Sequence, residues 1–237
     1  MAPAGIWSDL ADLVLPTECA GCRGVRLSLR QGACASCVAE LAALRPAPSR
    51  PTPAPVGLPG CVALGPYQGV LRETLLSYKE RGRHGLARPL GRLLAEVVAE
   101  AVGERRPVLL VPVPATARAV RDRHGDHLRR LARQAGLRLR AAGWSVAAAH
   151  PLRALPRPDS ATLDSAGRAA AAHAAFPART ARVPAARRAA AGRAVVVLDD
   201  IVTTGVTLAA VTRSLRDAGI PVYAAAVLAA TERRRRG

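Results

Sequence analysis

Short apolar runs alternate with amphipathic stretches over most of the chain. Residues 195–198 and 108–111 are each four consecutive apolar positions, which fits strands that are buried on both faces. Similar strands are expected over residues 61–65 and 221–230. Because these strands alternate with helical patterns, the sequence predicts an α/β fold with a mainly parallel, doubly wound sheet.

Apolar residues at helical spacing predict the connecting helices. The longest stripe consists of Leu86, Leu90, Leu93, Leu94, Val97 and Val98. Further helices are expected over residues 70–78, 128–142 and 159–175 and from Leu208 onward. Two segments have weaker patterns: residues 150–158 predict a short strand and turn, and residues 177–193 an irregular excursion.

The first 60 residues differ in composition from the rest. Residues 46–60 are rich in proline and lack apolar periodicity, which predicts a semi-extended linker. The chain is therefore expected to divide into an N-terminal unit (1–45), the linker (46–60), an α/β domain (61–232) and a basic tail (233–237).

Four cysteines in the N-terminal unit have the spacing of a metal site. Two CxxC pairs, Cys19/Cys22 and Cys34/Cys37, are separated by eleven residues that are rich in glycine. Four thiolates form a closed tetrahedral site for a structural Zn²⁺, so a small zinc ribbon is expected. Redox-active dithiols are the alternative interpretation. Cys61 lies outside this spacing and is expected to be a buried apolar residue.

The polar stretch after residues 195–198 carries the clearest ligand chemistry. A strand, a glycine-containing turn and a helix place backbone N–H groups at a helix N-terminus, where an anion is favoured. Two carboxylates at the end of a strand suit sugar hydroxyls or a shared Mg²⁺. Alternatively, an acidic pair followed by threonine forms a helix cap and turn. The candidate ligand-binding residues are Asp199, Asp200, Thr203, Thr204, Gly205 and Thr207.

Two basic features lie elsewhere in the α/β domain. Residues 115–127 follow the strand at 108–111 and contain Arg118, Arg121, Arg123 and His124. This loop is expected either to face a pyrophosphate at the same edge of the sheet or to be solvated. Lys79 is the only lysine, which indicates a position that needs a compact ammonium group or one that retained lysine by chance.

The formal charge of +18 makes polyanions, including single-stranded DNA, candidate partners. The charge is dispersed, however, and with only 3% aromatic residues there is little capacity for base stacking. No apolar run approaches the length of a membrane span, and the N-terminus lacks the pattern of a signal peptide. A cytoplasmic protein is therefore expected.

The order of these motifs resembles the competence protein F (ComF) family. The shared features are the four cysteines, a Y-Q-G…Y-K-E-R-G segment, V-P-V-P at residues 111–114 and D-D-I-V-T-T-G-V-T at residues 199–207. Where family members commonly have R-G-x-N, this chain has R-H-G-D at residues 123–126.

The resemblance implies a zinc ribbon joined to a type I phosphoribosyltransferase fold that binds 5-phosphoribosyl-1-pyrophosphate (PRPP) with Mg²⁺. Some members of the family are linked to uptake of transforming DNA, so the competence machinery is an implied partner. By motif position, Asp199 and Asp200 would hold the ribose, and the residues from Thr203 to Thr207 the 5′-phosphate. The implied activity is transfer of a phosphoribosyl group with release of pyrophosphate. A non-catalytic, nucleic-acid-associated accessory role is the alternative, and no catalytic residue is assigned.

Overall fold

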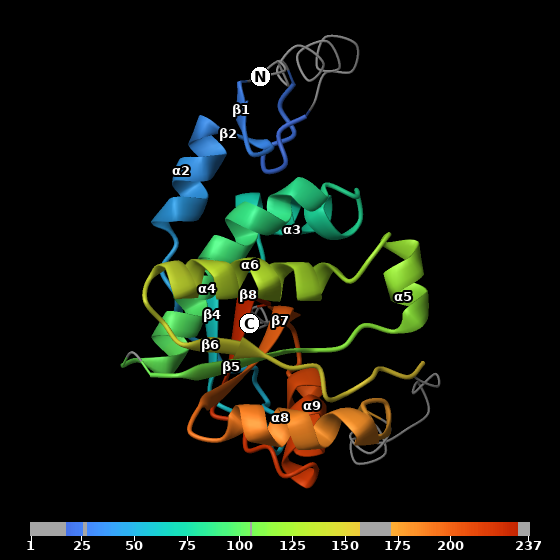
Figure 1. Cartoon of the computed structure of the whole chain (residues 1–237). Helices are drawn as coiled ribbons and strands as arrows, with labels where there is room; N and C mark the ends of the chain where they lie inside the picture. Colours follow the sequence, from blue (N-terminus) through green and yellow to red (C-terminus); the bar gives the residue numbers. More distant parts are fainter. Residues whose placement is uncertain (1–17, 26–27, 105, 157–171, 232–237) are drawn as a thin grey trace, which may run out of the picture.

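A six-stranded sheet forms the centre of the computed structural model, which describes residues 18–25, 28–104, 106–156 and 172–231 (Figure 1). Its strand order is β3-β4-β8-β7-β5-β6. Only β3 is antiparallel to its neighbour. The strands are β3 (Ala47–Pro48), β4 (Cys61–Pro66), β5 (Val108–Pro112), β6 (Val146–Ala148), β7 (Ala194–Val202) and β8 (Ala224–Ala230). The expected α/β class with a mainly parallel sheet is confirmed.

Strand β7 lies inside the sheet, between β8 and β5. Its residues 195–198 are at most 1% exposed, as are residues 108–111 of the neighbouring β5. Burying one valine or leucine side chain contributes roughly 1.5–3 kcal/mol to folding. These two apolar runs therefore fix the middle of the sheet and bring the carboxyl ends of β5 and β7 to the same edge.

Helices cover both faces of the sheet (Figure 1). On one side lie α3 (Gly69–Lys79), α4 (Ala87–Val102) and α6 (His127–Ala141), and on the other α8 (Val183–Ala190) and α9 (Val206–Asp217). Shorter helical segments are η1 (His84–Leu86), α5 (Ala117–Asp122) and η2 (Thr180–Arg182). None of the helices in the described ranges combines the length and apolarity needed to cross a bilayer.

The N-terminal unit packs at the end of the molecule next to α3 (Figure 1). It contains a two-stranded antiparallel sheet of β1 (Leu29–Arg30) and β2 (Ala33–Cys34), followed by α2 (Ala35–Ala43). Helix α2 begins directly after Cys34, so the second CxxC pair lies at the start of a helix.

Several expected elements differ from the structure. The segment expected to be a linker contributes β3, because Ala47 and Pro48 pair with Ala63 and Val62 of β4. The short strand expected over 150–158 lies earlier, at β6, and residue 152 forms only an isolated bridge. Residues 115–127 contain α5, and the supposedly irregular residues 177–193 contain η2 and α8.

Other expectations lie largely outside the described residues. These are most of the helix predicted over residues 159–175, the first 17 residues of the N-terminal unit and the basic tail.

Close packing of α4 on α6 gives one test of the fold. A Cβ added at Gly91 would overlap Gln134 Cβ and lie 3.2 Å from the backbone nitrogen of Ala135. We expect Gly91→Val to lower the free energy of unfolding by about 1–3 kcal/mol, because neither neighbour can move easily. Chemical denaturation measures the change. The control is Gly85→Val, where an added Cβ meets no atom within 4 Å; equal losses in both variants would contradict the packing.

Candidate functional site

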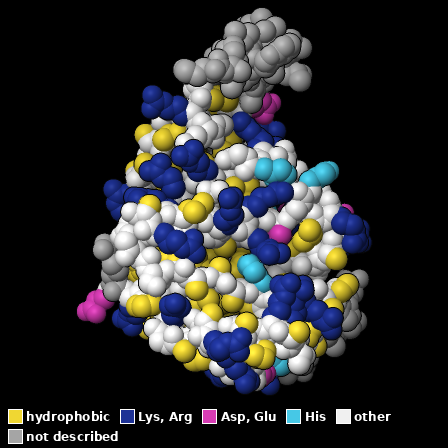
Figure 2. Space-filling model, viewed as in Figure 1, with side chains coloured by type: hydrophobic (Ala, Val, Ile, Leu, Met, Phe, Trp, Pro, Cys, Tyr) yellow, Lys and Arg dark blue, Asp and Glu magenta, His cyan; other side chains and the backbone are white. Residues whose placement is uncertain are grey.

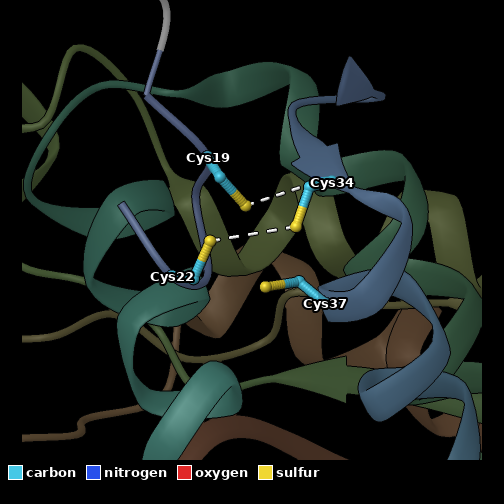
Figure 3. A group of neighbouring side chains, drawn as sticks. All are labelled: Cys19, Cys22, Cys34 and Cys37. Carbon is cyan, nitrogen blue, oxygen red and sulfur yellow. Dashed lines mark hydrogen bonds between the residues drawn. The ribbon is translucent and has the colours of Figure 1, made fainter. Parts of the chain in front are cut away.

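The four cysteines of the N-terminal unit converge on one point (Figure 3). Their sulfur atoms all lie within 4.8 Å of one another, and Cys22 Sγ is 3.8 Å from Cys34 Sγ. A tetrahedral site with Zn–S bonds of about 2.3 Å requires sulfur atoms about 3.8 Å apart. All four thiols are free rather than joined in disulfides. The cluster could therefore hold one metal ion such as zinc.

Local hydrogen bonds favour the thiolate form at two of these cysteines. A hydrogen bond with Ser36 Oγ and another from the Cys37 backbone lower the pKa of Cys34 to about 6. Burial alone would raise the pKa of Cys19, but backbone N–H groups, including that of Cys34 at 3.2 Å from the sulfur, outweigh it and lower the pKa. Burial and the neighbouring thiols raise the pKa of Cys37. The lowered pKa values of Cys34 and Cys19 suit a cation at the centre, because a metal binds the thiolate form.

Side chains from α3 and the turn after it hold the N-terminal unit against the α/β domain. Ser77 Oγ donates to the carbonyl of Ala20 at 3.0 Å. Arg83 donates to the carbonyls of Glu18 and Gly32 at 2.6 and 3.1 Å. The cysteine cluster is thus connected to the same helix that ends at Lys79.

Metal content tests the cysteine cluster. We expect the purified protein to retain one metal ion per chain after dialysis, and Cys34→Ser to lose it, because three thiolates and a serine hydroxyl bind much more weakly. Elemental analysis measures the stoichiometry. Cys61→Ala is the matched control, because Cys61 is a free, buried cysteine of β4 outside the cluster. Retention of metal by Cys34→Ser, or its loss from Cys61→Ala, would contradict the assignment.

The acidic pair belongs to strand β7 and not to the turn after it. The strand continues through Asp199 and Asp200 to Val202. Successive side chains of a strand point to opposite faces, so the two carboxylates are directed to different sides of the sheet. Asp199 is partly exposed, and its Oδ1 accepts the Asp200 backbone N–H at 2.9 Å. Neither acid is the N-cap of α9, which is Gly205.

Asp200 is buried in a polar contact with two other elements. Its Oδ2 lies 2.9 Å from Lys79 Nζ at the end of α3 and 2.7 Å from His127 Nε2 at the start of α6. Burial alone would raise the pKa of Asp200, but the hydrogen bond with His127 and the Lys79 ammonium outweigh it and lower the pKa to about 2. The carboxylate therefore stays ionised inside the protein, with its negative charge directed at Lys79.

The local sequence explains how both partners reach Asp200. Asp126 caps α6 by accepting the Arg129 backbone N–H at 3.0 Å, so the helix begins at His127. Tyr78, which is fully buried, donates through its hydroxyl to the carbonyl of His127 at 2.6 Å. This bond joins α3 to α6 and places Lys79, the next residue after Tyr78, beside the carboxylate.

The predicted phosphate-binding residues lie in the turn between β7 and α9. Thr203 and Thr204 are exposed, Thr207 is partly exposed and Gly205 is buried. Gly205 adopts a φ of +75°, which favours glycine, and a Cβ there would come within 3.2 Å of Leu58. The linker thus packs against this turn, and the turn requires glycine for both reasons.

A basic pocket of about 560 Å³ lies at the carboxyl end of β5, between the end of α3 and α5. Thr116 begins α5 by accepting the Ala119 N–H at 3.2 Å. The walls carry Lys79, Arg81, Arg118, Arg123, His124 and two acids, Glu80 and Asp122. The three arginines have carboxylate partners in Glu73, Asp122 and Glu80, at 3.2, 3.6 and 3.1 Å.

The loop after β5 was expected to face the turn at residues 203–207, but the pocket and this turn are connected only indirectly. Residues 203–207 are not among those that line the pocket, and the connection to β7 runs through the contact of Lys79 with Asp200. Neither His127 nor Tyr78 was predicted as a site residue from the sequence. The single lysine at position 79 was the one sequence signal near these residues. The contacts of His127 and Tyr78 depend on how distant segments of the chain come together, which the sequence does not reveal.

A scan of the chain against protein-family models found no match, and a search of curated proteins found none either. Function is therefore inferred from the residues and geometry of this chain.

Proposed function

We propose that the chain binds PRPP with Mg²⁺ as a phosphoribosyltransferase-like protein of the ComF type. The observation that carries this proposal is the position of the Asp199–Gly205 segment at the carboxyl end of the inner parallel strand β7, whose neighbour β5 has a basic pocket at its own carboxyl end. In open α/β sheets, ligands bind in the crevice outside the carboxyl ends of the strands.

The residues present suit the parts of such a ligand. Asp199 is a partly exposed carboxylate that could accept hydrogen bonds from ribose hydroxyls. The turn at residues 203–205 leads into α9, whose N-terminus favours the 5′-phosphate through its dipole. The pocket with its four Lys and Arg side chains suits the pyrophosphate, whose oxygens these cations can bind.

This division of roles suits a transfer reaction at C1 of the ribose. Pyrophosphate leaves as positive charge develops on the sugar, so the protein chiefly positions the reactants and neutralises oxygens. Mg²⁺ prefers carboxylate and phosphate oxygens, which Asp199 and the ligand would supply, and when bound it would neutralise charge on the departing group. The acceptor is not assigned.

We also propose that the cysteine cluster binds zinc in a structural role. Four sulfur ligands fill a tetrahedral coordination shell and leave no position for a substrate. The hydrogen bonds of Arg83 and Ser77 to the backbone of the cluster favour a role in holding the N-terminal unit on α3.

Ligand-induced stabilisation tests the PRPP proposal. We expect PRPP with Mg²⁺, at about 100 times its Kd, to raise the Tm by about 5–10 °C. Asp199→Asn should reduce this shift strongly, because the amide lacks the negative charge and carries an NH2 donor in place of one of the two accepting oxygens. Glu96→Gln, an exposed acid on α4, is the control and should keep the full shift. Absence of any shift in the wild-type protein at millimolar PRPP would refute the proposal.

Binding of single-stranded DNA is a second candidate function, favoured by the net charge of +18. Figure 2 shows Lys and Arg side chains scattered over the described part of the visible face rather than gathered in one stripe. Such a surface attracts polyanions through phosphate contacts and without sequence preference.

Salt dependence tests the DNA candidate. We expect binding of an oligonucleotide to weaken steeply between 50 and 200 mM salt, with a log–log slope of about −0.7 for each phosphate contacted. Heparin, a polyanion without bases, should compete for the same surface. No measurable binding at the lowest ionic strength would exclude this function.

A further inference from the structure

The two adjacent acids of β7 have different surroundings, although a shared role in ribose binding was expected for them. Asp200 has a side chain that is only 7% exposed, and both polar contacts of its Oδ2 are with protein groups. Asp199 points to the opposite face of the strand and is partly exposed. The alternation of the strand therefore separates the pair.

Asp200 lies directly behind the wall of the basic pocket. Lys79 is both the residue that lines the pocket and the residue whose ammonium lies 2.9 Å from the buried carboxylate. The lysine side chain is 17% exposed and lines the pocket, while its ammonium remains in contact with Asp200. The three arginines of the pocket differ from Lys79, because the side chains of their carboxylate partners are between 22% and 64% exposed.

His127 fixes the geometry of this contact from the other side. A carboxylate can only accept, so the ring N–H of His127 donates to the same oxygen that Lys79 approaches. The imidazole belongs to the first residue of α6, whose carbonyl is bonded by Tyr78. Three elements, α3, α6 and β7, thus hold one ammonium group at one place in the pocket wall.

We propose that Lys79 binds the pyrophosphate group directly and that Asp200 is a positioning residue, which acts on the ligand through Lys79. Of the two acids, only Asp199 then faces the ribose. This inference rests on the proposed function and refines it by giving the acidic pair two separate tasks. A flexible lysine has several rotatable bonds, and a buried counter-ion restricts them before the ligand arrives. Asp200 also places a negative charge close to the bound anion, so it sets the strength of the lysine contact.

Two ligands distinguish this role from ribose binding. Inorganic pyrophosphate contains the group that Lys79 would contact but has no ribose, whereas PRPP contains both. Calorimetry with Mg²⁺ and each ligand gives the dissociation constants. We expect Lys79→Met to weaken both ligands by about tenfold, the loss of one charge-assisted contact. Asp199→Asn should weaken PRPP by a similar factor and leave pyrophosphate within about twofold.

The decisive variant is Asp200→Asn. If Asp200 acts through Lys79, Asp200→Asn changes the Kd of PRPP and the Kd of pyrophosphate by the same factor. When Lys79→Met is already present, adding Asp200→Asn should change neither Kd by more than about twofold. Weakening of PRPP alone would overturn the inference, because it would make Asp200 a ribose ligand. An effect that persists in the Lys79→Met background would overturn it as well.

Two further outcomes separate this inference from the proposed function. If the wild-type protein binds pyrophosphate but not PRPP, the proposed function fails, while the Lys79 and Asp200 variants still test the inference with pyrophosphate. If it binds neither, the inference fails. Should Asp200→Asn melt at too low a temperature to titrate, Lys79→Met and Lys79→Arg carry the test: Lys79→Met must lose pyrophosphate affinity, and Lys79→Arg must retain more of it.

Discussion

A carboxylate that is removed from water must be neutralised, and the site is arranged around this requirement at Asp200. An unpaired buried charge costs several kcal/mol, so the surrounding elements must supply a cation or hydrogen-bond donors. Lys79 and His127 supply them from two helices that are 48 residues apart in the sequence. Because the carboxylate needs both partners, the ends of α3 and α6 are tied to the carboxyl end of β7.

The apolar sheet makes this constraint possible. Strands β5, β7 and β8 are nearly all apolar and bury both faces, so their register is fixed by packing rather than by polar contacts. Among these three strands, charged side chains appear only near the carboxyl end of β7. A rigid apolar interior with a few polar groups at the strand ends is the arrangement that can hold a small ligand in a defined orientation.

The strands and longest helices could be predicted because their signals are local. Residues 108–111 and 195–198 are uninterrupted apolar runs, and the stripe that begins at Leu86 has helical spacing. Other elements lacked such a signal. Strand β6 is only partly buried, and α8 buries a single alanine, Ala186, so neither produces a clear apolar pattern.

The candidate site was predictable in part. The cysteine spacing led directly to the cluster that the structure brings together. The end of β7 was placed too early, because the apolar run ends at Leu198 while the backbone pairing continues to Val202. Asp199 and Asp200, which were expected where the strand ends, are therefore consecutive residues within it. The contact of Lys79 and His127 with Asp200 could not be predicted, because it depends on how α3 and α6 cross the sheet.

The short strand β3 has a consequence for how the protein behaves at high concentration. An exposed sheet edge offers unpaired N–H and C=O groups to other chains, and proteins avoid this with short or proline-containing edge strands. Here β3 is two residues long, ends in a proline that cannot donate a hydrogen bond, and lies outside β4 in the sheet. The opposite edge is the three-residue β6. Both borders of this largely apolar sheet are thus poor templates for strand addition, which protects its Val- and Ala-rich interior from intermolecular pairing.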